Sequence, residues 1–104
     1  MTHHDYFIML AREDRIRVRF GVETGVVIDF VVQYEAEIRS QWRCVVRYDL
    51  AHGFLHRDRP DPLGELTIKE PVAHGTLAEA MTEAIREIKA NWPDYRRWYE
   101  GRLR

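Results

Sequence analysis

The sequence predicts an α+β domain: an antiparallel β-meander of four to five strands covered by one long C-terminal helix and a short terminal helix. Polar and apolar residues alternate along three successive segments of the first half, and short loops join these segments. The C-terminal third instead carries apolar residues at helical spacing. With 104 residues, the chain has the size of a single domain, which we assign to residues 1–104.

The alternating segments define the strands of the meander. They cover Arg15–Phe20, Val26–Ile38 and Trp42–Asp49, each with one apolar and one polar face. The short apolar run Tyr6–Leu10 predicts a further strand, and Leu66–Lys69 predicts a last one before Pro71.

Three-residue loops are expected at residues 23–25 and 39–41, because two-residue loops would place apolar residues opposite charged ones in both hairpins. The expected cross-strand pairs are Phe20 with Ile28, Ile38 with Trp42, Tyr34 with Val46, and Gln33 with Arg47.

The C-terminal helix begins at a capping box formed by Thr76 and Glu79. Its apolar positions predict a face that packs on the sheet. Pro93 is expected to break the helix, and a short second helix should follow. For the arginine-rich and aromatic end of the chain, docking on the domain is favoured over stacking of nucleic-acid bases.

Composition excludes several classes of protein. The net charge of −1 lacks the strong basic excess of many nucleic-acid-binding domains. No apolar run is long enough for a membrane span, and the N-terminal residues lack the pattern of a secretory signal. Cys44 is the only cysteine, so no internal disulfide and no all-cysteine zinc site is expected. We expect Cys44 and Trp42 to point into the core, and the protein to be cytoplasmic.

One segment, Arg47–Asp58, concentrates groups suited to chemistry at the end of a strand. Histidines can exchange protons near neutral pH, and arginines can stabilise charge on a phosphate. Gly53 permits an unusual backbone bend in the expected loop. The candidate catalytic residues are His52, His56, Arg47, Asp49, Arg57 and Asp58.

Three interpretations of this segment remain open. The first is metal-free acid–base cleavage of an RNA phosphodiester bond, in an exposed concavity where the side chains converge. The second is a metal site with His52, His56, Asp49 and Asp58 as ligands. The third is a purely structural network of turn and ion-pair contacts. The spacing of the two histidines suits a helix better than a loop, so we expect no metal and no cofactor.

The sequence resembles two known families, one closely and one distantly. Residues 30–35, 42–49, 52–53 and 56–58, with a helix over 80–92, resemble a small uncharacterised prokaryotic family over roughly residues 15–100. More distantly, Arg47, Tyr48, Asp49, His56 and Arg57 are similar to the Arg-Tyr-Asp strand end and His-Arg loop of TumE-type toxins of toxin–antitoxin modules. Here residues 50–54 replace the glycine-rich part of that loop.

The resemblance implies a toxin-like protein that binds or cleaves RNA without a metal, with a cognate antitoxin or neighbouring-gene protein as partner. The alternative is a non-catalytic protein-binding module, such as the antitoxin or adaptor subunit of a two-gene system. A purely structural, self-associating domain is a third possibility. No membrane partner is expected. A homodimer is expected, because Tyr6–Leu10 would form an uncharged edge strand. The C-terminal aromatic residues Trp92, Tyr95, Trp98 and Tyr99 would add apolar surface to this interface.

Overall fold

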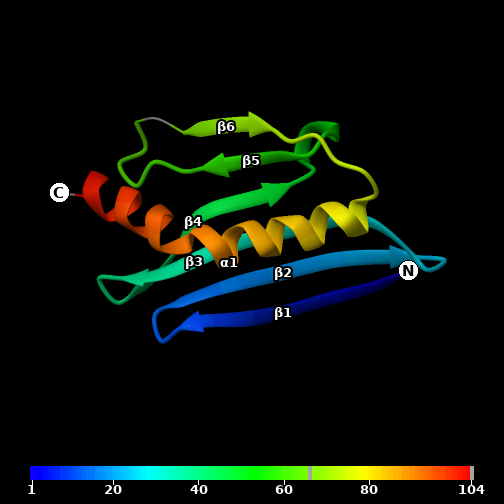
Figure 1. Ribbon diagram of the computed structural model, residues 1–104, viewed down its shortest axis with the longest axis horizontal. Helices are drawn as coiled ribbons and strands as arrows, with labels where there is room; N and C mark the ends of the chain where they lie inside the picture. Colours follow the sequence, from blue (N-terminus) through cyan, green and yellow to red (C-terminus); the bar gives the residue numbers. More distant parts are fainter. Residues whose placement is uncertain (66, 104) are drawn as a thin grey trace.

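The chain folds into one antiparallel sheet and one long helix (Figure 1). The computed structural model describes residues 1–65 and 67–103, apart from the side chain of His52. The six strands of the described sheet lie in the order β1-β2-β3-β4-β5-β6. The elements are β1 (Thr2–Ala11), β2 (Asp14–Glu23), β3 (Val26–Ile38), β4 (Gln41–Asp49), the 3₁₀ turn η1 (Ala51–Gly53), β5 (His56–Arg59), β6 (Ile68–Pro71) and α1 (Leu77–Arg102).

The α+β class and the meander with a long C-terminal helix are confirmed, but the number of strands is six rather than four to five. The additional strand is β5, whose residues His56–Arg59 are all polar. This strand forms because its backbone pairs with β4 on one side and β6 on the other. A search of the sequence for alternating apolar residues does not detect such pairing. The last predicted strand appears as Ile68–Pro71; its expected first residue, Leu66, lies outside the described residues.

The β2–β3 and β3–β4 hairpins each turn over two residues, so the prediction of three-residue loops is wrong. Positive φ angles at Thr24 and Gly25, and at Arg39 and Ser40, are typical of turns whose twist matches that of the strands. Irregularities in the ladder then shift the pairing of each hairpin. The irregularity between Gly21 and Val22 places Phe20 opposite Phe30, whereas the two-residue turn itself places Ile38 opposite Gln41. The expected pairs of Tyr34 with Val46 and Gln33 with Arg47 are confirmed.

Helix α1 runs without interruption through Pro93, so the predicted short terminal helix does not exist as a separate element. A proline inside a helix costs about 3 kcal/mol, and tertiary contacts on both sides of Pro93 offset this cost. Tyr95 and Tyr99 are buried against the sheet. Arg96 donates to Asp14 Oδ1 over 2.7 Å and to the Glu37 carbonyl over 3.1 Å.

The prediction that the C-terminal segment docks on the domain is therefore confirmed. Its aromatic residues pack into the fold or against it, so they do not supply the second apolar surface on which the expected homodimer partly rested. Among the described residues, no helix combines the length and the apolar character needed to cross a membrane.

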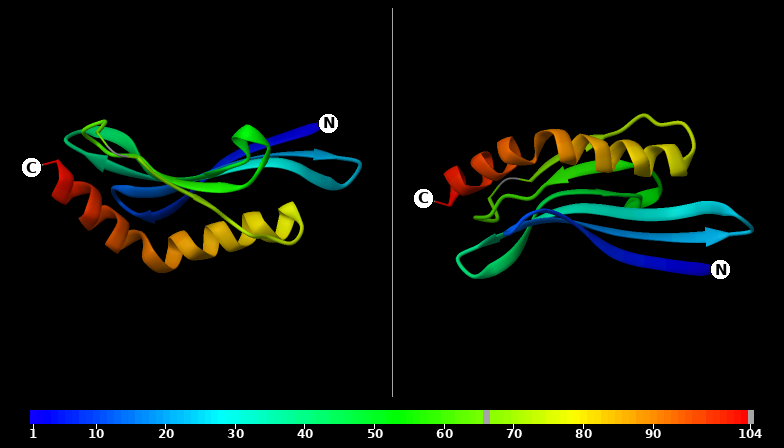
Figure 2. Two further views of the ribbon diagram at one scale, coloured as in Figure 1. Left: turned by 90° about the horizontal axis from the view of Figure 1, so that it is seen from above. Right: turned by 60° about the horizontal axis from the view of Figure 1, so that its bottom comes forward.

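The two faces of the sheet have different surroundings, because α1 lies on one side only (Figure 2). We call the side under α1 the inner face and the other side the open face. Ile16, Val18, Val32 and Tyr34 are fully buried on the inner face, where Ile88 of α1 joins the same core.

The open face carries the alternate residues of the same strands. In β2 these are Arg15, Arg17 and Arg19. Trp42 also lies here, with the Arg15 guanidinium 3.8 Å from its ring, so its predicted position in the core is wrong. The irregularity between β3 and β4 lies between the pairs at Glu35 and Tyr34, and such a bulge reverses the alternation of side chains.

Candidate functional site

Four of the six candidate residues lie together on the open face, at the junction of β4 and β5. Asp49 pairs with His56 across the two strands, and Arg47 pairs with Asp58. Because residues two apart in a strand point to the same side, the ladder brings all four side chains to one place. We call Arg47, Asp49, His56 and Asp58 the open-face cluster.

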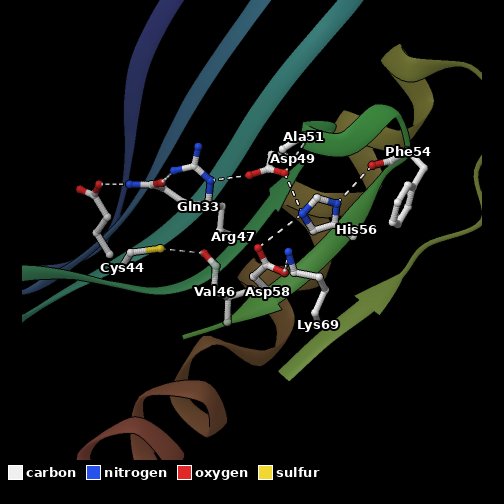
Figure 3. Close-up of polar contacts among 11 residues, drawn as sticks. Gln33, Cys44, Val46, Arg47, Asp49, Ala51, Phe54, His56, Asp58 and Lys69 are labelled. Atoms are coloured by element: carbon white, nitrogen blue, oxygen red, sulfur yellow. Dashed lines mark hydrogen bonds and ion pairs between the residues drawn. The ribbon is translucent and has the colours of Figure 1, made fainter. Parts of the chain in front are cut away.

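The open-face cluster is connected by short polar contacts (Figure 3). Arg47 Nε donates to Asp49 Oδ2 over 2.6 Å. His56 Nε2 lies 3.0 Å from Asp49 Oδ1 and 3.4 Å from Asp58 Oδ2. On the other side of the ring, His56 Nδ1 lies 3.2 Å from the Phe54 carbonyl oxygen. The imidazole is thus held between two carboxylates and a backbone acceptor.

Further contacts fix the edges of this cluster. Arg47 also donates to Gln33 Oε1 over 3.0 Å, and the Ala51 amide donates to Asp49 Oδ1 over 3.1 Å. Burial would by itself raise the pKa of Asp49, but the hydrogen bonds from Arg47 and Ala51 and the nearby charge of Arg47 outweigh it and hold that pKa below its usual value. Asp49 is therefore an anchored carboxylate anion at neutral pH.

The cluster is covered rather than open to solvent at its centre. The side chain of His56 is only 1% exposed, whereas that of Arg47 is 41% exposed. The Phe54 ring packs 5.4 Å from the imidazole, and η1 follows Asp49 on the same side. The expected exposed concavity is therefore wrong for His56, which does not reach a substrate from this position.

Arg57 does not join the open-face cluster. Arg57 points to the inner face, where it donates to the Tyr95 hydroxyl over 3.0 Å and to Glu70 Oε2 over 3.0 Å. It lies on the opposite side of β5 from His56 and Asp58, because strand residues alternate. The side chain of His52 lies outside the part of the chain that the structure describes.

A second polar network lies on the inner face, and sequence reasoning missed it. Tyr48 and Tyr95 both donate to Glu87 Oε1, and Asn91 donates to Glu87 Oε2 over 2.8 Å. We call Tyr48, Arg57, Glu87 and Tyr95 the helix-side cluster. Its members are up to 47 residues apart in the chain, so no local pattern indicates it.

In this second network, Glu87 is a carboxylate that accepts hydrogen bonds from several donors. Burial would raise the pKa of Glu87, but hydrogen bonds from Tyr48, Tyr95 and Asn91 and the charge of Arg57 together lower it. Burial, followed by the contact with Glu87, raises the pKa of both tyrosines. Both hydroxyls therefore stay protonated and act as donors.

Cys44 is a poor nucleophile, as the sequence predicted. Burial raises its pKa to about 12, so the thiolate is scarce near neutral pH. Like Trp42, two residues earlier in β4, Cys44 lies on the open face, where it pairs with Glu35, so its predicted position in the core under α1 is wrong. Its thiol lies 3.8 Å from the Val46 carbonyl oxygen.

A band of arginines and aromatic rings on the open face also escaped the sequence analysis. The Arg15 guanidinium lies 4.1 Å from the centre of the Phe7 ring and 3.8 Å from that of Trp42. Arg17 pairs with Gln33, and Gln33 pairs with Arg47, so this row of polar side chains leads into the open-face cluster. The alternating arginines at positions 15, 17 and 19 were the available signal, but they read only as the polar face of a strand.

Three members of the open-face cluster have donors suited to a cation. Asp49, His56 and Asp58 each offer one ligand atom within 4.8 Å of those of the other two. Imidazole nitrogen and carboxylate oxygen together are typical ligands of first-row transition metals.

The comparisons with known proteins give a family without a described activity. No curated protein and no solved structure matches the chain. A family model described as "Domain of unknown function (DUF7718)" matches residues 1–104. The chain therefore belongs to the DUF7718 family.

Proposed function

We propose that this chain is a toxin-like RNA-binding protein that holds single-stranded RNA on the open face of its sheet. The observation that carries the proposal is the band of exposed arginines and aromatic rings on that face. Arginine contacts phosphates, and aromatic rings stack on unpaired bases. The Phe7 and Trp42 rings are 47% and 36% exposed.

The charge on the open face supports the proposal, although the whole chain is not basic. Arg15, Arg47 and their partners Glu35 and Asp49 form ion pairs in which the carboxylates are the more deeply buried members. Each carboxylate fixes its arginine from the sheet side, and the guanidinium faces outward. In these two pairs the positive group is therefore nearer to a ligand on the open face than the negative group.

The geometry favours RNA binding over cleavage by histidine acid–base chemistry. The His56 ring is enclosed between Asp49, Asp58 and Phe54, so a bound RNA on the open face meets Arg47 before it meets His56. The resemblance to TumE-type toxins is consistent with an RNA ligand, and the function stated here is the binding step.

The test is the fluorescence anisotropy of labelled single-stranded RNA with variants of the open face. Arg19→Ala and Arg17→Ala should each weaken binding and lower the slope of log affinity against log salt by about 0.7 per lost phosphate contact. Phe7→Ala should cost about 1–3 kcal/mol of binding free energy if a base stacks on that ring.

Arg97→Ala is the matched control, because Arg97 is equally charged and 73% exposed on α1. It should leave RNA binding unchanged. Equal losses for Arg97→Ala and Arg19→Ala would indicate non-specific attraction and would refute an open-face site.

The alternative role, a protein-binding module, is favoured by one observation at the sheet edge. β1 is an edge strand of the described sheet, and it exposes Tyr6, Phe7 and Met9. Residues 6–10 carry no charge, and long uncharged edges pair readily with other strands. A second copy of the chain is the natural occupant, because two β1 strands can pair antiparallel about a two-fold axis.

Light scattering over a dilution series tests this homodimer. The expected mass is twice that of one chain, and Met9→Lys should reduce it to that of the monomer, because a charge on the edge opposes pairing. Leu63→Lys, at an exposed residue in the β5–β6 connection, should leave the dimer intact. A monomer at every concentration for the unmodified chain would contradict the homodimer.

A further inference from the structure

We propose that Asp49, His56 and Asp58 form a binding site for one divalent first-row transition-metal cation, of which Zn²⁺ and Mn²⁺ are the appropriate probes. The sequence predicts no metal, because the spacing of His52 and His56 suits a helix better than the expected loop. The structure removes that objection, since a strand replaces the loop and the third ligand comes from the neighbouring strand. The site adjoins the proposed RNA surface, but metal binding does not depend on RNA.

The distances between the ligand atoms fit a metal. Bonds of about 2.0–2.2 Å from a zinc-like ion to nitrogen and oxygen place neighbouring ligand atoms about 3.0 Å apart in octahedral geometry and about 3.4 Å apart in tetrahedral geometry. His56 Nε2 lies 3.0 Å from Asp49 Oδ1 and 3.4 Å from Asp58 Oδ2. Two of the three separations thus match those that a shared cation imposes, and all three ligand atoms lie within 4.8 Å of one another.

The outer atoms of the ligands are oriented by surrounding groups, as in metal sites (Figure 3). A metal-bound histidine commonly donates its other N–H to a backbone carbonyl, and ligating carboxylates are themselves hydrogen-bonded. His56 Nδ1 faces the Phe54 carbonyl oxygen at 3.2 Å, and Asp49 Oδ2 accepts from Arg47 at 2.6 Å. These contacts leave Nε2 of His56 and Oδ1 of Asp49 directed at each other.

Asp58 provides an independent observation. Its Oδ1 is buried and accepts no hydrogen bond within the described part of the chain, and its nearest ion-pair partner, Lys69 Nζ, is 3.9 Å away. A buried carboxylate oxygen without a hydrogen bond is costly. The oxygen of Asp58 that faces His56 is Oδ2, so a cation would relieve this cost by binding both carboxylate oxygens of Asp58 together with Asp49 and His56.

The donor set also indicates the class of cation. One imidazole and two carboxylates suit zinc, manganese and iron(II), whereas magnesium favours oxygen ligands and retains its waters. Three protein ligands leave at least one coordination position for water or for a phosphate oxygen, beside Arg47.

The competing occupant is a proton on Nε2 of His56, which would donate to the same two carboxylates. Both occupants satisfy the geometry, so direct binding measurements decide between them. Calorimetric titration of chelator-treated protein with Zn²⁺ and with Mn²⁺ should give one equivalent bound per chain. Mg²⁺ should bind at least about 10-fold more weakly than Zn²⁺.

The variants separate this site from incidental binding by exposed histidines. Asp58→Asn keeps the side-chain shape and should weaken Zn²⁺ binding at least about 10-fold, and His56→Gln should abolish it. The control is the double variant His3→Gln with His4→Gln, which removes the exposed histidines of β1 and should bind Zn²⁺ unchanged. Circular dichroism of each variant verifies the fold before titration.

Nitrogen-detected NMR of the histidine rings gives a second readout. Adding Zn²⁺ should shift Nε2 of His56 to the position of a metal-bound nitrogen, in the full-length protein without RNA. The proposal is overturned if the unmodified chain binds no Zn²⁺, if Asp58→Asn binds it equally well, or if only the His3 and His4 variant loses it.

Discussion

The two polar clusters of this protein come from the same short stretch of chain, yet they lie on opposite faces of the sheet and use their atoms differently. Residues 47–58 supply Arg47, Asp49, His56 and Asp58 to the open face and Tyr48 and Arg57 to the inner face. In the helix-side cluster, Tyr48 and Arg57 of the sheet contact Glu87 and Tyr95 of α1, while the hydrogen bond from Tyr95 to Glu87 lies within the helix.

In the open-face cluster, His56 and Asp58 contact each other and residues of β4, β6 and the connecting turn. We therefore expect the helix-side cluster, which joins the sheet to α1, to contribute more to the stability of the domain than the open-face cluster, which lies on the side of the sheet that α1 leaves uncovered. Substitutions in the two clusters should therefore have unequal effects on stability.

The largest expected effect is that of Glu87→Ala. It removes the acceptor shared by Tyr48 and Tyr95 and the charge next to Arg57, and leaves these groups partly buried without their partner. We expect a loss of about 2–4 kcal/mol in the free energy of unfolding, measured by urea denaturation.

Glu83→Ala is the control for that substitution, since Glu83 lies one helical turn earlier and makes an exposed ion pair with Arg86. Its loss should stay within about 0.5 kcal/mol. If the two variants unfold at the same urea concentration, the helix-side cluster does not stabilise the domain in the way described.

A smaller effect is expected for Arg47→Met in the open-face cluster. Methionine retains much of the apolar stem, and the guanidinium is partly exposed, so the loss of stability should be about 1 kcal/mol or less. The same variant should bind RNA more weakly, because Arg47 joins the arginine band. A loss as large as that of Glu87→Ala would show that the two clusters have equal structural roles.

The sequence predicts the elements that are buried under α1 better than the arrangement of side chains on the open face. Alternation of polar and apolar residues predicted the central strands, and helical spacing with the Thr76 cap predicted the start of α1. Both signals mark residues that are buried between the sheet and the helix, and the spacing of apolar residues along the sequence predicts such burial directly. Pro93 misled the prediction because local propensity yielded to the contacts of Tyr95 and Arg96 with the sheet.

The open face was harder to predict because its partners are set by register. Asp49 and His56 are neighbours only because β5 pairs with β4, and the polar sequence of β5 carries no strand signal. The separation of Arg57 from His56 follows from the same strand, since adjacent residues point to opposite faces. The sequence places all six candidate residues in one segment, but their division between two faces depends on the pairing of the sheet.

The smallest expected effect is the dependence on pH of the stabilisation that the helix-side cluster provides. The pKa of Glu87 in the folded protein is lower than its ordinary value of 4.5, so the folded state binds this proton less readily than the unfolded chain. The stabilisation is therefore complete above about pH 4.5 and declines as the pH falls through the lower folded value. Glu87→Gln lacks this titration, so the difference in unfolding free energy between the unmodified chain and Glu87→Gln should be constant near neutral pH and shrink below pH 4.5. Urea denaturation from pH 7 to pH 3 measures this difference, and a gap that stays constant down to pH 3 would show that the charge of Glu87 contributes nothing to the cluster.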